Sequence, residues 1–171
     1  MIYTLIDPQH PLLNSPLPEI PADTEPENRK ELMDNIVESM KHYGGIGLSA
    51  NQVGLALRMC VFGDNKHYIP FFNPKILEYG GPEVAIEEGC LSYPGLFVKI
   101  WRQEWIIAQW EDENRELHKE NFTGLQSRVF QHEYDHMQGI DFRSLAGRMA
   151  LDIAQRKLKR GQRKLKKMQE K

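Results

Sequence analysis

The chain has 171 residues and a mass of 19.9 kDa, which fits one domain with at most a short appendage. Hydrophobic residues make up 40% of it and charged residues 27%, a balance that excludes disorder along the whole chain. The formal net charge of −2 hides an uneven distribution. Residues 148–171 hold ten Lys or Arg and two acidic residues, a net charge of +8. Residues 1–147 therefore hold 12 basic and 22 acidic residues, a net charge of −10. We therefore predict an acidic body and a basic tail.

The N-terminal residues MIYTLIDPQHPLL show neither the basic start and apolar core of a signal peptide nor an Arg-rich presequence. No stretch approaches the roughly 20 apolar residues that cross a bilayer, and two cysteines are too few for a disulfide-stapled secreted scaffold. We therefore expect a soluble protein of the cytoplasm of a bacterium or of a bacteriophage-infected cell. Prolines within residues 6–26 predict an extended surface segment, and they are Pro8, Pro11, Pro16, Pro18, Pro21 and Pro26.

Residues 24–43 predict an amphipathic helix, with Thr24 as its N-cap and Gly44 as the glycine that follows its C-terminus. Apolar residues recur along it at helical spacing, at Leu32, Met33, Ile36, Val37 and Met40. Residues 44–54, GGIGLSANQVG, have little helix or strand character and predict a loop. Turn residues then separate β-rich runs that predict strands at residues 58–62, 69–72, 84–87, 97–101 and 105–111.

Helical spacing returns after these strands. A helix is predicted over residues 124–138 with Gly139 as its stop, and a last helix from near Ser144 that becomes mostly Lys and Arg. The apolar face of the last helix would comprise Leu145, Met149 and Ile153. The predicted fold class is α+β, with mixed or antiparallel sheets packed around the central helix 124–138, an N-terminal amphipathic helix and a C-terminal helix.

The strongest local signal is the sequence His132-Glu133-Tyr134-Asp135-His136 inside the predicted central helix. His132 and His136 would lie one turn apart on the same face, where both imidazoles can bind one metal ion. Glu133 lies beside them, where it can handle a proton of water at the metal. This pattern is typical of a hydrolytic metal site, although the same spacing also occurs by chance in helices that bind no metal.

A tetrahedral site of this kind needs a third protein ligand. In the long metalloprotease motif that ligand is a histidine six residues after the second one, and Phe142 stands at this position. No carboxylate further downstream lies in a suitable acidic motif. The best candidate is upstream, at Cys90 in the turn-rich sequence EEGCLSYPG, where a cysteine is poorly placed to fill a core. Cys60, in the apolar run LRMCVF, is predicted to be a core residue.

Three segments together resemble the motifs of the peptide deformylase family. Residues 45–52, GIGLSANQ, are similar to its first motif, residues 88–92, EGCLS, to its second, and residues 131–136, QHEYDH, to its third. The similarity covers roughly residues 1–147, which we predict to be the catalytic domain, and leaves residues 148–171 as a basic helical tail. It implies an enzyme that removes the N-formyl group from the starting methionine of nascent polypeptides and releases formate.

The resemblance also implies a role for each matching residue. Glu133 would take a proton from the attacking water and return it to the departing amine. Gln52 and the backbone N–H of Leu91 would stabilise the oxyanion that forms. The metal ligands, with a fourth position left for water, would be Cys90, His132 and His136.

The methionine side chain would bind in an apolar slot close to the Gly-rich loop, at residues that would equally suit plain core. The implied substrate-binding residues are Ile46, Gly47, Ile86, Gly89, Leu125 and Val129. An acid–base–acid set is predicted to support the ligands, formed by Glu88, Arg102 and Asp135. The chain departs from the usual Ala, small aliphatic residue and Leu of the family at Ser49, Tyr93 and Met137. We expect these departures to alter the pocket shape and to touch neither a ligand nor the base.

A thiolate and two imidazoles suit Zn²⁺, whereas the family characteristically works with Fe²⁺ and accepts Ni²⁺ or Co²⁺, so we expect one Fe²⁺ or a substitute per chain. Eight of the twelve residues 156–167 are Lys or Arg, which suits either docking on the ribosome or a solvated helix end. We expect a monomer that acts on N-formylmethionyl peptides and binds no membrane. Two other functions stay open, a zinc-dependent peptidase built on the same helix and a metal-free module whose basic tail binds RNA.

Overall fold

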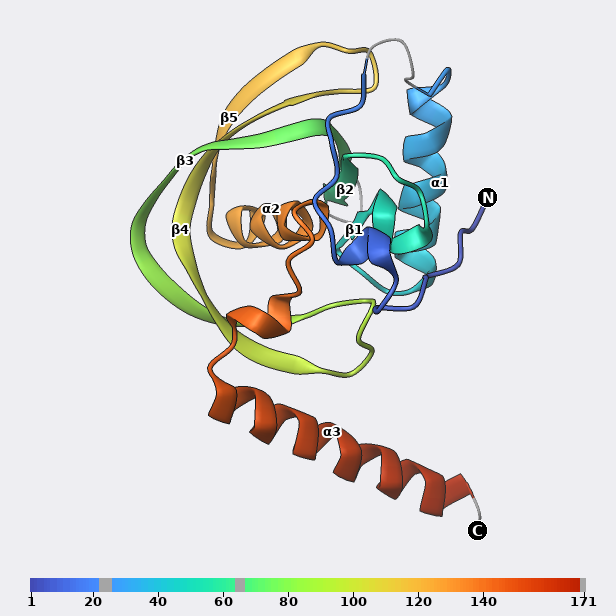
Figure 1. The fold of residues 1–171 in the computed structure, drawn as a ribbon, viewed down its shortest axis with the longest axis vertical. Helices are drawn as coiled ribbons and strands as arrows, with labels where there is room; N and C mark the ends of the chain where they lie inside the picture. Colours follow the sequence, from blue (N-terminus) through green and yellow to red (C-terminus); the bar gives the residue numbers. More distant parts are fainter. Residues whose placement is uncertain (22–25, 64–66, 170–171) are drawn as a thin grey trace.

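The computed structural model describes residues 1–21, 26–63 and 67–169. Its α-helices are α1 (Arg29–His42), α2 (Gly124–Met137) and α3 (Arg148–Gln169). Its strands are β1 (Gly47–Ser49), β2 (Met59–Gly63), β3 (Tyr68–Gly89), β4 (Phe97–Glu111) and β5 (Leu117–Thr123), and its 3₁₀ helices are η1 (Pro11–Leu13), η2 (Ala50–Val53) and η3 (Phe142–Leu145). Figure 1 shows the long strands curving around α2, with α1 beside β1 and β2 and with α3 extending away from the rest. No helix in the described part of the chain is both long enough and apolar enough to cross a membrane.

The five strands of the described residues form one sheet in chain order, and every neighbouring pair is antiparallel. Strands β3 and β4 are 22 and 15 residues long, and three register shifts in their pairing fall between residues 72 and 83 of β3. Such irregularities bend a strand, which fits the curvature of the sheet around α2 in Figure 1. The predicted α+β class with an antiparallel sheet is therefore confirmed, and the mixed form of the sheet is not.

The main core lies on the concave side of the sheet, where α2 packs. Phe130 of α2 is fully buried, and its ring centroid lies 5.2 to 6.1 Å from those of Phe62, Phe71 and Phe122. Burying one such ring contributes roughly 1.5–3 kcal/mol relative to leaving it in water. This aromatic cluster, whose members come from β2, β3, β5 and α2, is therefore what fixes α2 against the sheet. Cys60 of β2 is buried in the same cluster, as predicted for a core residue.

Helix α1 covers β1 and β2, and most of its predicted apolar positions are buried against them. The helix begins at Arg29, because the side chain of Asn28 accepts a hydrogen bond from the N–H of Glu31 (2.9 Å) and so caps the first turn. The predicted cap, Thr24, lies outside the described residues. Gly44 follows the helix with φ +73°, as predicted.

The predicted β-rich runs fall inside longer strands. Residues 69–72 and 84–87 both belong to β3, and residues 97–101 and 105–111 both belong to β4. Two strands are missed, since β1 lies inside the predicted loop 44–54 and β5 consists largely of exposed polar residues. Both are the end strands of the sheet in its described part, where one edge has no neighbour and the local sequence carries little apolar alternation.

The proline-rich N-terminal segment lies on the surface as predicted, since Pro11, Pro16, Pro18 and Pro21 are exposed, but η1 interrupts its extended course and a few of its apolar side chains are anchored in the core. Leu17 and Ile20 are buried, and the N–H of Leu17 donates to the carbonyl oxygen of Met137 (2.9 Å). Gly139 makes this close passage possible, because a Cβ at that position would lie 2.5 Å from the backbone of Ser15. With φ +70°, Gly139 also ends α2, as predicted.

Helix α3 begins at Arg148, later than predicted, because residues 142–145 form η3 and Ala146 is extended. The predicted apolar face is wrong, since Leu145 belongs to η3 and Met149 and Ile153 are 77% and 60% exposed. The start of a helix decides which residues share a face, because each residue turns it by about 100°. The side chains that pack against the body are Ala150, Leu151, Ala154 and Leu158.

We expect Phe130→Ala to lower the free energy of unfolding by about 3–5 kcal/mol, because it removes a fully buried ring and leaves a cavity under α2. Urea denaturation followed by circular dichroism measures this loss. Trp101→Ala is the control, because that ring is exposed on β4 and its removal should cost less than about 0.5 kcal/mol. A loss at Phe130 no larger than at Trp101 would show that the aromatic cluster does not hold α2.

Candidate active site

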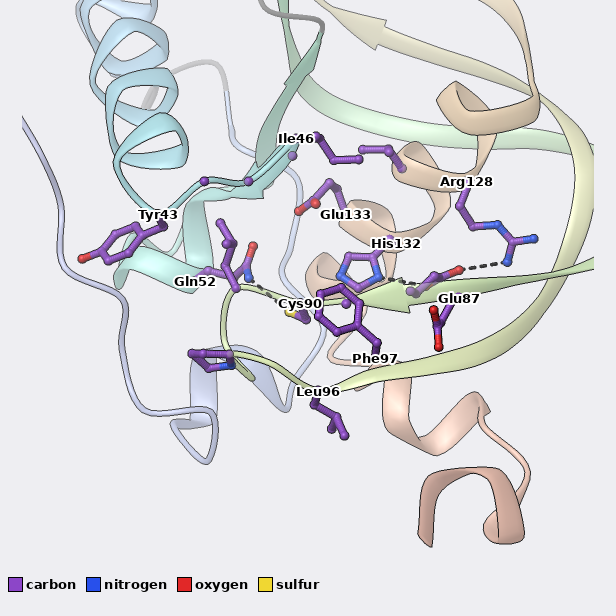
Figure 2. A pocket seen from close by; sticks show the side chains of 18 of the residues that line it. Tyr43, Ile46, Gln52, Glu87, Cys90, Leu96, Phe97, Arg128, His132 and Glu133 are labelled. Carbon is purple, nitrogen blue, oxygen red and sulfur yellow. Dashed lines mark hydrogen bonds and ion pairs between the residues drawn. The ribbon is translucent and has the colours of Figure 1, made fainter. Parts of the chain in front are cut away.

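A cavity of about 620 Å³ lies where the 44–47 loop, the end of β3, the turn after β3 and α2 meet. Figure 2 shows side chains from these segments around it, with His132 and Glu133 projecting from α2 and with Gln52 and Cys90 near one another. All six residues implied for substrate binding line this cavity, namely Ile46, Gly47, Ile86, Gly89, Leu125 and Val129. Segments far apart in the chain therefore meet as predicted, while the role of each residue stays a prediction.

The three implied metal ligands also come together. Cys90 follows the last residue of β3, and His132 and His136 lie one turn apart on α2. Their ligand atoms all lie within 4.8 Å of one another, and Cys90 Sγ is 3.3 Å from His136 Nε2. All three side chains are buried. Bonds of about 2.0–2.3 Å to a tetrahedral ion put its ligands about 3.5 Å apart, so this donor set and its spacing fit one metal ion.

Glu88 joins this site to the sheet. Its Oε2 lies 3.0 Å from His132 Nδ1, and Arg102 donates to both of its oxygens (2.7 and 3.0 Å). Arg102 also donates to Asp135 on α2 (2.7 Å), so the predicted set of Glu88, Arg102 and Asp135 is assembled as one network. Burial alone would raise the pKa of Glu88, but hydrogen bonds from His132, Arg102 and Arg128 lower it to about 2. Glu88 is therefore ionised and holds the imidazole of His132 in one orientation.

The pKa values of the two histidines are shifted in opposite directions. Burial disfavours the charged form of His132, but hydrogen bonds with Cys90 and Glu88 outweigh burial and raise its pKa to about 10. Burial lowers the pKa of His136 to about 3, and the charge of neighbouring His132 lowers it further. The hydrogen bonds of the site thus favour the protonated form of His132, and burial favours the neutral form of His136.

Glu133 is buried between α2 and β1. Ser49 Oγ donates to its Oε2 (2.8 Å), and a Cβ at Gly47 would lie 2.5 Å from its Oε1. Burial raises the pKa of the Glu133 carboxyl, and the neighbouring charge of His132 works in the opposite direction. The carboxylate is thus fixed beside the cavity with an increased affinity for a proton, as a group that accepts and returns protons requires.

Gln52 lies in η2 and is fully buried. Its Oε1 accepts a hydrogen bond from the N–H of Ser49 (3.0 Å), and its Nε2 donates to Ser92 Oγ (3.0 Å) and to Cys90 Sγ (3.5 Å). Both N–H donors of this amide are therefore engaged with Cys90 and Ser92, at the edge of the cavity that Gln52 lines. None of the described residues accepts a hydrogen bond from the backbone N–H of Leu91. The amide of Gln52 and the backbone N–H of Leu91 thus both lie next to Cys90, while their role in oxyanion stabilisation stays a prediction.

Known proteins are similar to this chain in sequence and in fold. The family model described as Polypeptide deformylase matches residues 2–148. The chain belongs to the peptide deformylase family. Over 114 residues it is 40% identical to the peptide deformylase of Thermotoga maritima (67% of this chain, 70% of that protein) and 45% identical to that of Dictyoglomus turgidum (67% and 74%). The crystal structure of a peptide deformylase from Legionella pneumophila matches with a TM-score of 0.83 at 28% identity, covering 95% of this chain and 96% of that chain.

Membership confirms the predicted resemblance to the family and makes this chain an enzyme of the deformylase family. The matched segment ends at residue 148, where α3 begins. The division into a catalytic domain of residues 1–147 and a tail of residues 148–171 stays a prediction, as do the roles of the individual site residues.

The three departures of this deformylase from the usual family residues do not act as expected. Ser49 touches the implied base directly, through the hydrogen bond to Glu133, so the expectation that it touches neither a ligand nor the base is wrong. Tyr93 and Met137 are absent from the described lining of the cavity, so neither shapes the pocket as expected. The Tyr93 hydroxyl donates to Asp141 (2.7 Å), and Met137 is fully buried in the core.

Several lining residues of the deformylase site have no predicted role, and Arg128 and Phe97 are two of them. Arg128 lies three residues after Leu125 and four before His132, so the spacing of cavity-facing positions on α2 is a signal that could have found it. Phe97 comes from β4, and a Cβ at Gly89 would lie 2.6 Å from its ring. This contact depends on the pairing of Gly89 with Phe97 across β3 and β4, which no local pattern in the sequence reveals.

We expect Gly47→Ala to lower kcat/KM for a formyl-methionyl peptide by about 100-fold, because the added methyl group would displace Glu133 from its position. Release of formate measures the rate, and circular dichroism checks the fold. Gly147→Ala is the matched control, since a Cβ there meets no atom within 4 Å. Equal activity of the two variants would show that the placement of Glu133 is not what requires glycine at position 47.

Proposed function

We propose that this chain uses one divalent metal ion to remove the N-formyl group from the N-terminal formylmethionine of nascent polypeptides, with release of formate. Membership in the deformylase family supports formyl removal from nascent peptides. The observation that carries the metal dependence is the buried set of Cys90, His132 and His136, whose donor atoms lie within 4.8 Å of one another beside Glu133. We propose Fe²⁺ as the working ion, with Zn²⁺, Ni²⁺ or Co²⁺ as substitutes, because thiolate and imidazole ligands accept all of these.

The ion would supply Lewis acidity, which activates water for attack on the formyl carbon. Glu133 takes the proton of the attacking water and passes it to the amine nitrogen as the C–N bond breaks. Its hydrogen bond from Ser49 holds the carboxylate still during both transfers. Glu88 keeps His132 oriented through Nδ1, which leaves Nε2 for the ion.

The oxyanion of the tetrahedral intermediate receives hydrogen bonds from the amide of Gln52 and from the backbone N–H of Leu91. Both donors lie next to Cys90, and the burial of Gln52 excludes water that would compete for them. Each well-placed donor of this kind contributes roughly 3 kcal/mol to lowering the barrier.

The side chain of the formylated residue binds among the apolar residues of the cavity. Ile46 and Leu125 are 56% and 63% exposed although both are large and apolar, and Ile86 and Val129 complete the same wall. Exposed apolar surface around a cavity favours covering by a ligand. Because every group of the site comes from one chain, we propose that a monomer in the cytoplasm is sufficient for the reaction.

We expect Glu133→Gln to reduce kcat by at least about 100-fold while the bound metal stays at one ion per chain, because the substitution removes the proton carrier but no ligand. Formate release measures the rate after anaerobic purification, and elemental analysis measures the metal. Exhaustive chelation of the native enzyme should abolish activity, and Fe²⁺ should restore it.

Cys90→Ser is the matched control, because it removes the sulfur ligand without changing Glu133 and should lower the metal content itself. Full activity after chelation would contradict the proposed metal dependence. Cleavage of internal peptide bonds in place of formyl release would favour the peptidase alternative, and an inactive chain that binds RNA would favour the metal-free module.

We also propose that α3 docks this enzyme on the ribosome. Figure 1 shows α3 extending away from the body, and all of the basic residues in its segment 156–167 are exposed. These residues are Arg156, Lys157, Lys159, Arg160, Arg163, Lys164, Lys166 and Lys167. Clustered exposed cations attract the phosphates of RNA, and this attraction weakens steeply as salt releases the counterions.

We expect the triple change Lys164→Gln, Lys166→Gln and Lys167→Gln to weaken co-sedimentation with ribosomes and to make it less dependent on salt, because three phosphate contacts are lost. The control removes the same charge from the body through Lys30→Gln, Lys41→Gln and Lys75→Gln. Equal binding by the two triple variants, or binding that does not respond to salt, would contradict docking through α3.

A further inference from the structure

Arg128 places a guanidinium in a wall that is otherwise apolar. It lines the cavity together with Leu125 and Val129, its neighbours on the same side of α2, and with Ile46 and Ile86 across the slot. Only 5% of Arg128 is exposed. No other Arg or Lys stands among the described residues that line this cavity. An arginine is rarely buried to this extent without a specific set of partners.

The guanidinium is held by three acceptors from two strands. Nη1 donates to Glu88 Oε1 (2.9 Å) and to the carbonyl oxygen of Ile100 (2.9 Å), and Nη2 donates to the carbonyl oxygen of Val84. Figure 2 shows Arg128 extending from α2 with its ion pair drawn as a dashed line. Strands β3 and β4 thus fix the guanidinium against α2, so that it cannot swing out to solvent.

These bonds leave part of the guanidinium unused. Arginine has five N–H donors, and three of them are engaged. None of the described residues accepts a hydrogen bond from the remaining two, one of which is on Nε. The Nε atom is not among the fully buried polar atoms of the described residues that lack a partner, so water can reach it when the cavity is empty. A fixed donor of this kind at a substrate cavity favours a ligand that brings an acceptor, because a ligand without one would displace the water and leave the donor unpaired.

We infer that Arg128 determines which side chain the slot accepts, by favouring an unbranched side chain that carries a hydrogen-bond acceptor near its end. This inference rests on the proposed function, in which the slot holds the side chain of the formylated residue. The thioether of methionine is a weak acceptor, the sulfoxide oxygen of oxidised methionine is a polar and stronger one, and the all-carbon chain of norleucine has none. The enzyme therefore also acts on N-formyl peptides that begin with methionine sulfoxide.

Three formyl tripeptides that differ only in the first residue test this role, with methionine sulfoxide, methionine or norleucine at that position. Arg128→Leu should lower kcat/KM by about tenfold or more for the sulfoxide peptide, by a smaller factor for the methionine peptide, and least for the norleucine peptide. The graded loss should lie mainly in KM, because the contact is made in the ground state as well as in the transition state. Arg128→Lys keeps a cationic donor and should give intermediate losses in the same order.

Arg102→Leu is the matched control. Arg102 holds the same carboxylate of Glu88 but is not among the described lining residues, so its loss should lower all three rates by one common factor. Ratios between peptides measured on one preparation do not depend on how much of a variant is folded. An equal loss for all three peptides in both Arg128 variants would overturn the inference and leave Arg128 as a support for Glu88. Failure of the native enzyme to release formate from any of the three would overturn the proposed function as well.

Discussion

A single buried carboxylate, Glu88, ties together the elements that build the site. It accepts hydrogen bonds from Arg102 of β4 and Arg128 of α2 and lies 3.0 Å from His132 Nδ1, while it stands itself at the end of β3, two residues before Cys90. The same side chain therefore orients one candidate ligand, His132, and anchors the end of β3 that leads into another, Cys90. Any shift of α2 against the sheet would break several charge-assisted hydrogen bonds at once.

Burying this many charges costs free energy, and the network offsets the cost only because every member is paired. Ion pairs in a protein interior often contribute little to stability compared with apolar residues of the same volume. Their benefit here is positional, since the aromatic cluster around Phe130 already holds α2 on the sheet. Packing thus supplies the stability, and the ionic network sets the angles of the side chains that face the cavity.

Two glycines allow backbone segments to approach α2 closely. Gly47 allows β1 to approach α2 so closely that Glu133 and Ser49 come within hydrogen-bonding distance, and Gly139 lets the N-terminal segment pass against the end of α2. Ser49, where the family usually has Ala, donates to Glu133, so a departure in a motif can contact the proposed base directly. Its neighbour in the sequence, Leu48, is fully buried in the core behind the site.

Much of this protein follows from its sequence alone. The apolar spacing of α1, the end of α2 at Gly139, the α+β class and the three motifs are local patterns, because helix periodicity, glycine conformation and motif spacing are properties of neighbouring residues. Tertiary structure decided what depends on contacts between distant segments. It set the edge strands β1 and β5, the packed face of α3, the burial of Leu17 and the bonds that turn Arg128 toward Glu88. Such features depend on which surfaces meet in the folded protein. Burial and hydrogen bonding between distant segments determine which surfaces meet, and the neighbouring residues in the sequence do not.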